Sequence, residues 1–260
     1  MGVRIQIPGI TVANPVAFNP PVARGLEGLF LLTGTDPAIV RKNLALDPAD
    51  PDYLAAVMGS PAFTATGVVC TNLSAYLDTR VADSAIGTTL VIARNEDPPS
   101  SFIAPYAACW ADDTSDAYTG QVGASIMQRL PGTSPAGTVA GTIAIVNASN
   151  PTAATVGRSD MAVADVTAWH AYAAGYDGAN RWAWDLTSNG ATKVSAATTA
   201  KISNSQATWL LGSAAGGIPN SGRSRIAAFV RHSVALTDTE VAAWITFFRS
   251  HPRMAALGTF

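Results

Sequence analysis

Charge and cysteine are scarce in this sequence, and each shortage excludes a class of protein. Only 13% of the 260 residues are charged, the net charge is −2, and the longest cationic run is Arg41-Lys42. Binding of nucleic acid needs a clustered basic surface, so it is not expected. The two cysteines, Cys70 and Cys109, make neither a disulfide framework nor metal-ligand spacing, and we expect both to be buried free thiols.

Long apolar runs are missing as well. No stretch reaches the roughly 20 apolar residues that a membrane-spanning helix needs, so membrane insertion is not expected. The first residues, MGVRIQIPGITV, lack the apolar core and cleavage site of a signal peptide. This pattern predicts a protein made in a cytoplasm.

Glutamate is also rare, and this bears on catalysis. The three glutamates are Glu27, Glu96 and Glu240. Hydrolysis of a glycosidic bond usually needs two carboxylates that flank it. Only Glu240 has a second carboxylate two positions away, Asp238, and both lie where a helix is predicted to begin. No serine stands in a nucleophile-elbow sequence either. The sequence therefore predicts a protein that is not an enzyme.

What the chain does contain is a long series of strand signals. From Gly25 onward about a dozen short apolar segments, GTTLVIARN among them, alternate with Gly, Pro, Asn and Asp clusters. The links are of hairpin length and no strand–helix alternation is visible, which predicts an antiparallel sandwich or barrel over residues 25–260. Residues 1–24 contain four prolines and predict an extended docking arm, whose VRIQI segment can add to a partner's sheet edge. A floppy tail is the alternative.

One helix is clearly marked near the C-terminus, in ALTDTEVAAWITFFRSHPR. Thr237 is a natural N-cap, Glu240 completes a capping box, and Pro252 ends the helix. Apolar residues recur at helical spacing, which predicts one amphipathic helix lying against the β-body with a buried stripe of Val241, Trp244, Ile245 and Phe248.

The segment WHAYAAGYDGANRWAWDL concentrates the aromatic residues. Asp177-Gly178 predicts a turn between two strands, and counting back from it pairs Tyr176 with Arg181 and Tyr172 with Asp185. In this register one face is dry and is predicted to point into the sandwich; it carries Trp169, Trp182, Trp184 and Leu186. The other face is predicted to be wetter, either a solvated surface or a recognition surface.

Parts of the sequence resemble laminin-G-like domains of the concanavalin A-like lectin/glucanase superfamily. The resemblance rests on AWHAYAAGYDGANRWAWDLTSNGATKVS, on LLGSAAGG and SGRSRIAAFVRHSVALTDTEVAAWITFFR, and on GTTLVIAR. The opening region, NLALDPADPDYLAAVMGSPAFTATGVV, resembles the family more loosely. It implies an all-β fold, a jelly roll of two antiparallel sheets followed by the C-terminal helix. One sheet of such domains often carries a ligand.

The predicted ligand-binding residues lie on the wetter hairpin face, where tyrosine rings can stack on sugars. They are His170, Tyr172, Tyr176, Arg181 and Asp185. Packing under a neighbouring loop or subunit is the alternative. His170 is expected to be a hydrogen-bonded histidine of the sheet and not a member of a catalytic triad.

A metal site is a second hypothesis. Laminin-G-like domains often hold one calcium ion, and Asp112, Asp113 and Asp116 offer the oxygen ligands that calcium prefers. A solvated hairpin tip explains the same three carboxylates. No other cofactor is expected.

The proline-rich arm, the low charge and the missing secretion signal resemble components of tailed-bacteriophage particles. This resemblance implies a structural protein of the virion, in the tail, tail tip or fibre region, with a lectin-like face that meets host-surface carbohydrate or other virion proteins. A homo-oligomer docked through residues 1–24 is expected. The alternatives are a capsid or tail decoration protein that binds only virion proteins, and a bacterial carbohydrate-binding or glycoside-hydrolase-like protein.

Overall fold

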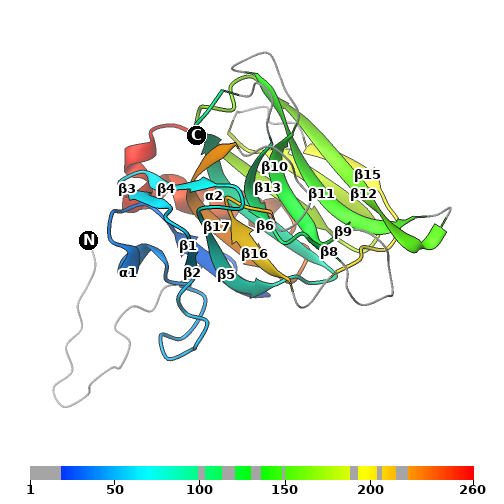
Figure 1. The fold of residues 1–260 in the computed structure, drawn as a ribbon, viewed down its shortest axis with the longest axis horizontal. Helices are drawn as coiled ribbons and strands as arrows, with labels where there is room; N and C mark the ends of the chain where they lie inside the picture. The colour runs from blue at the N-terminus through cyan, green and yellow to red at the C-terminus, as the bar shows by residue number, and fades with distance from the viewer. Residues whose placement is uncertain are drawn as a thin grey trace.

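Two antiparallel β-sheets form most of the molecule (Figure 1). The computed structural model describes residues 19–98, 103–112, 121–129, 136–147, 150–187, 193–203, 207–214 and 222–260. Within these residues the sheets face each other as a sandwich, which confirms the predicted all-β, two-sheet jelly-roll fold class.

The first sheet has eight strands in the order β15-β14-β13-β6-β17-β4-β3, with β1 also paired to β17. Its strands are β1 (Leu26–Leu31), β3 (Ala62–Thr64), β4 (Gly67–Thr71), β6 (Gly87–Asn95), β13 (His170–Tyr176), β14 (Asn180–Asp185), β15 (Lys193–Ala197) and β17 (Arg223–His232). The strands β6 and β17 lie at its centre and are almost wholly buried, which fits their β-branched and apolar composition.

The second sheet has seven strands in the order β12-β11-β10-β7-β16-β5-β2. Its strands are β2 (Ala56–Met58), β5 (Tyr76–Ala82), β7 (Ala104–Ala108), β10 (Ala124–Arg129), β11 (Gly137–Asn147), β12 (Asn150–Val163) and β16 (Thr208–Leu211). A small sheet pairs β8 (Ala111–Asp112) with β9 (Gln121–Val122).

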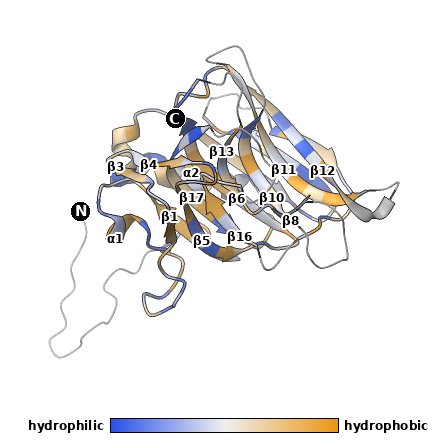
Figure 2. Ribbon diagram, in the orientation of Figure 1, coloured by the Kyte–Doolittle hydropathy of each residue, from blue (hydrophilic) through white to orange (hydrophobic). Residues whose placement is uncertain are grey.

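The long strand β12 forms one edge of the second sheet. Exposed and buried residues alternate along it from Val156 to Val163, and Figure 2 shows hydrophilic residues interspersed along the strand. Its N-terminal part, NPTAATVGRSD, is polar and contains a proline, so the sequence there carries little strand signal. Proline is tolerated here since an edge strand leaves backbone N–H groups unpaired.

The C-terminal segment covers the outer face of the first sheet, away from the second sheet. The helix α2 (Asp238–Ser250) has Thr237 as N-cap and the complete capping box with Glu240, as predicted. A short 3-10 helix, η1 (Pro252–Leu257), follows it, and a helical turn, α1 (Pro37–Val40), lies near β1. All four predicted stripe residues of α2 are buried against apolar side chains of β1, β6, β13 and β17.

The two cysteines, Cys70 and Cys109, are buried free thiols, as expected.

In the described part of the predicted arm, Val22 joins the apolar cluster under α2, and the Arg24 guanidinium pairs with Glu240 at 2.5 Å. Among the described residues there is no helix with the length and apolarity to cross a membrane.

Candidate functional site

The hairpin of β13 and β14 has the predicted register. The paired residues are Tyr172 with Asp185, Ala174 with Ala183, and Tyr176 with Arg181. At the turn, the Asp177 carboxylate accepts hydrogen bonds from the backbone N–H groups of Ala179 (2.9 Å) and Asn180 (2.7 Å). Gly178 has a φ of +100°, a conformation that favours glycine.

The prediction that one hairpin face is wet is wrong. Tyr172 is 0% and Tyr176 is 5% exposed, and both belong to the core between the two sheets. The tryptophan face, with Trp182, packs towards α2 instead of into the sandwich. Because α2 covers the outer face of this sheet, the hairpin is enclosed on both sides, and the tyrosine rings supply apolar area to the interior.

His170 and Asp185 are nevertheless brought together. They are diagonal neighbours in the register, and such pairs lie within reach of long side chains. His170 Nδ1 lies 2.9 Å from Asp185 Oδ2, and Nε2 lies 2.8 Å from the backbone oxygen of Asp165. The imidazole stacks on Tyr172, with ring centroids 5.3 Å apart, and Tyr172 stacks on Tyr106 at 5.5 Å. The expectation of a hydrogen-bonded histidine is confirmed.

The surroundings of His170 favour its charged form. Both ring nitrogens face acceptors, so both are placed to donate. Burial opposes the charge, but the Asp185 hydrogen bond and charge outweigh burial and raise the pKa of His170. Burial likewise opposes the charge of Asp185, yet the hydrogen bonds from His170 and Thr187 lower the pKa of that carboxyl.

This pair predicts a defined pH window of stability. The raised pKa of His170 stabilises the fold fully below the unfolded value of about 6.5, and the contribution is lost as pH rises through the folded value. The lowered pKa of Asp185 stabilises the fold above about 3.9, and this is lost as pH falls through the folded value. We expect His170→Gln to lower the melting temperature most between about pH 4 and 6.5. An equal decrease at pH 5 and pH 9 would contradict this.

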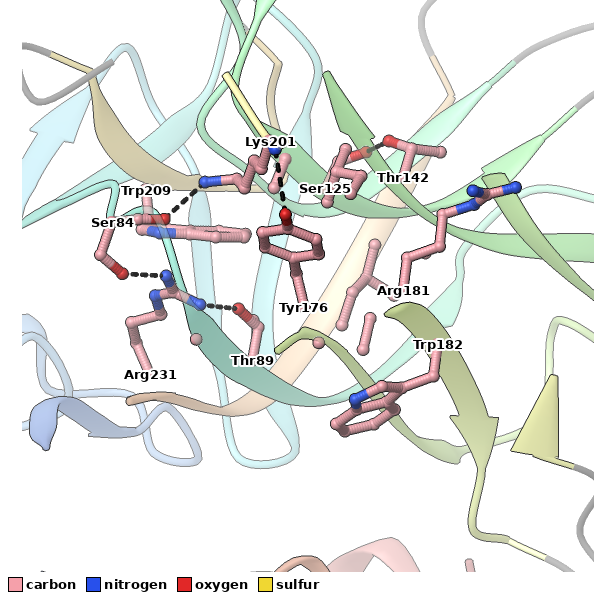
Figure 3. A pocket seen from close by; sticks show the side chains of 17 residues that line it. Ser84, Thr89, Ser125, Thr142, Tyr176, Arg181, Trp182, Lys201, Trp209 and Arg231 are labelled. Carbon is pink, nitrogen blue, oxygen red and sulfur yellow. Dashed lines mark hydrogen bonds between the residues drawn. The ribbon is translucent and has the colours of Figure 1, made fainter. Parts of the chain in front are cut away.

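A narrow pocket lies beside the hairpin, between the two sheets (Figure 3). Tyr176 and Arg181 line it, together with small residues such as Gly141 and Ala174. A side chain at Gly141 would meet the Ala174 Cβ at 2.8 Å, so the two sheets approach closely here. The remaining cavity of about 20 Å³ has room for about one water molecule. A sugar ring does not fit.

Three charged side chains meet at one side of this pocket. Lys201 Nζ lies 2.6 Å from each carboxylate oxygen of Asp83 and 2.6 Å from the Ser84 carbonyl. The Arg231 guanidinium donates to the hydroxyls of Ser84 (2.5 Å) and Thr89 (3.2 Å), and lies 3.9 Å from Asp83. The side chains of Asp83, Lys201 and Arg231 are each at most 4% exposed. Figure 3 shows Lys201 and Arg231 converging on Ser84.

A wider groove of about 320 Å³ opens next to β5. Its polar lining comes from β1, from β5 and the residue that follows it, and from the loop between α1 and β2: Glu27, Asn43, Asp50, Asp52, Thr79, Arg80 and Asp83. Asn43 holds the groove wall in place, because its side-chain amide donates to the Glu27 carbonyl and its oxygen accepts from the Leu29 N–H. The groove is large enough for a sugar unit and presents carboxylates and a guanidinium.

Arg80 has an unusual backbone at this groove. Its φ is +60°, a left-handed conformation that costs free energy in a non-glycine residue. The β5–β16 register shifts at the same place, since Thr208 pairs with Ala82 but Leu210 pairs with Asp78. Such irregularities re-aim side chains, and here the Arg80 guanidinium reaches Asp52 at 3.3 Å.

The predicted calcium site is only partly within the described residues. Asp113 and Asp116 lie outside them, and of Asp112 the backbone alone is described, in β8. In the described part of the chain no three His, Cys, Asp or Glu side chains gather as a metal site. Calcium binding by these aspartates stays a prediction.

The groove and the buried charges were not predicted from the sequence. A signal was present for Arg231, because a cation inside the apolar strand IAAFVRHS must find a buried partner. Arg80 gave no such signal, since LDTRVAD alternates like any half-buried strand.

Comparisons with solved structures place the fold in a class. No family model matches the chain, and no curated protein matches it in sequence. A mutant of Trypanosoma rangeli sialidase that displays trans-sialidase activity is similar, with a TM-score of 0.55 and 8% identity over 84% of this chain and 32% of that one. The binding domain of botulinum neurotoxin DC, solved in complex with SialylT, has a TM-score of 0.54 and 11% identity over 89% of this chain and 52% of that one.

Domain 4 of AbnA, a GH43 extracellular arabinanase from Geobacillus stearothermophilus, matches over almost its full length. Solved in complex with arabinotriose, it has a TM-score of 0.52 and 14% identity over 84% of this chain and 97% of that one. The chain spans about a third to a half of the first solved structures it matches. These identities show the fold alone, which is that of a jelly-roll β-sandwich.

Proposed function

We propose that this protein is a non-enzymatic carbohydrate-recognition module. The observation that carries the proposal is the groove beside β5, where Arg80, in a strained backbone conformation, lies beside carboxylates. Strain of this kind persists where the surrounding structure imposes it, and it gathers at binding sites. Two similar folds, in structures solved with arabinotriose and SialylT, support carbohydrate as the ligand class.

The chemistry of the groove suits the hydroxyl groups of a sugar. Carboxylates such as Asp50 accept hydrogen bonds from hydroxyls, and the Arg80 guanidinium donates to ring and hydroxyl oxygens. Leu26, Leu46 and Val81 add apolar surface to the same groove. A few placed polar groups on an apolar lining are typical of small-ligand sites.

Glycan binding by the groove is testable with one variant and a matched control. We expect Arg80→Ala to weaken binding by on the order of tenfold, since a charged hydrogen bond contributes about 1.5–3 kcal/mol. Arabinotriose and sialic-acid oligosaccharides are suitable probes, measured by calorimetry and on a glycan array. Arg223→Ala is the control, because Arg223 is a comparably exposed arginine paired with an aspartate and does not line the groove. Equal binding by the two variants would place the site elsewhere, and no binding by the parent would overturn the proposal.

We propose further that the module serves in the particle of a tailed bacteriophage, in its tail region, as an oligomer docked through residues 1–24. The proline-rich arm and the low charge of the sequence support this location. Val22 and Arg24 contact the folded domain, so the C-terminal end of such an arm is anchored to it. Detection of the protein by mass spectrometry in purified particles tests the location.

A further inference from the structure

The buried charges beside the interior pocket do not balance. Lys201 and Arg231 are cations, and Asp83 is the one carboxylate in contact with them among the described residues. The three Lys201 ammonium hydrogens are satisfied by the two Asp83 oxygens and the Ser84 carbonyl. The Asp83 carboxylate therefore compensates mainly the charge of Lys201. The Nη2 atom of Arg231 lies farther from it, 3.9 Å from Asp83 Oδ1.

Arg231 is left with surplus donors in a dry place. The residue is 4% exposed, two of its five N–H groups donate to hydroxyls, and its Nε has no partner. The guanidinium carbon also lies 5.1 Å from the centre of the Trp209 ring, which partly compensates the charge. The indole nitrogen of Trp209, 1% exposed, has no partner either.

Loss of the proton does not remove this charge. Burial lowers the pKa of Arg231, yet a guanidinium starts from so high a value that it stays protonated near neutral pH. Glu27, the remaining carboxylate that acts on Arg231, is partly exposed on β1 and screened by solvent. A buried cation without a full counter-charge is unfavourable, and a bound anion would supply the missing negative charge.

We propose that the pocket beside Arg231 binds one small monovalent anion, of the size of chloride. The pocket is lined by Arg231, Lys201, Thr89 and Ser84, and it has room for about one water-sized particle. A carboxylate or phosphate group of a larger molecule does not fit this space. The anion completes the charge balance between the two sheets and stabilises the fold. Arg231 and Lys201 line this pocket and not the groove beside β5, which shares only Asp83 with the charge cluster.

Bromide identifies the site directly, because it replaces chloride and gives anomalous scattering. Crystals of the full chain grown in sodium bromide are expected to show an anomalous peak within hydrogen-bond distance of the Arg231 guanidinium. In solution, the melting temperature is expected to rise and saturate with sodium chloride, compared with sodium gluconate at equal ionic strength. A pocket that holds only water, or melting curves that are equal in the two salts, would overturn the proposal.

Arg231→Met separates this site from general salt effects. Methionine fills similar space without charge and leaves Lys201 and Asp83 as a balanced pair, so the variant is expected to lose the chloride-specific increase in melting temperature. Arg225→Met is the control, since Arg225 pairs with Glu96 away from the pocket and the variant keeps the increase. Retention of the increase by Arg231→Met would overturn the proposal. If that variant does not fold, the bromide measurement on the parent decides alone.

Discussion

Trp244→Ala is expected to lower the free energy of unfolding by about 3–5 kcal/mol. Trp244 is 0% exposed and lies in the apolar cluster that joins α2 to the first sheet. Its ring stacks on Phe248 with centroids 5.7 Å apart, and its indole N–H donates to His232 Nε2 at 2.9 Å. The substitution leaves a large cavity and an unpaired buried acceptor, and urea denaturation measures the loss.

Thr237→Ala, on the same helix, is expected to have a smaller effect on stability than Trp244→Ala, and the two losses can be compared directly. Thr237 accepts a hydrogen bond from the Glu240 N–H as N-cap, and its loss is expected to lower the free energy of unfolding by about 1 kcal/mol. If both variants unfold at the urea concentration of the parent, α2 does not stabilise the β-body. If Thr237→Ala is the more damaging, capping and not burial holds the helix.

The helix could be predicted from the sequence because its signals are local. The cap, the capping box and the spacing of Val241, Trp244 and Phe248 all lie within a dozen residues. The hairpin register could also be predicted, because the turn at Asp177-Gly178 determines which residues of the two strands lie opposite each other. The fold class followed from many short strands with short links.

The burial of the hairpin faces could not be predicted in the same way. Alternation separates two faces but does not say what covers each, and here α2, some 50 residues further along the chain, covers the tryptophan face. The second sheet covers the opposite face, so Tyr172 and Tyr176 are interior residues. The groove depended on the left-handed Arg80 and a shifted register, for which no residue type is diagnostic.

The second large effect is expected from Asp83→Asn. This change keeps the shape of the side chain but leaves Lys201 and Arg231 without their shared carboxylate in a site where neither is more than 4% exposed. Breaking a buried ion pair by removing one partner costs about 3–5 kcal/mol, because an uncompensated charge stays in the interior. We expect a decrease of at least this size in the free energy of unfolding, measured by urea denaturation.

A second substitution distinguishes loss of charge balance from loss of packing. In the double variant Asp83→Asn with Lys201→Met the unpaired ammonium is gone, so the double variant is expected to be more stable than Asp83→Asn alone. The double-mutant cycle isolates the Asp83–Lys201 coupling, since the two side chains are in direct contact at 2.6 Å. Additive losses would mean that the two charges act independently. Independent charges would have to be stabilised by solvent, which contradicts the burial of both side chains.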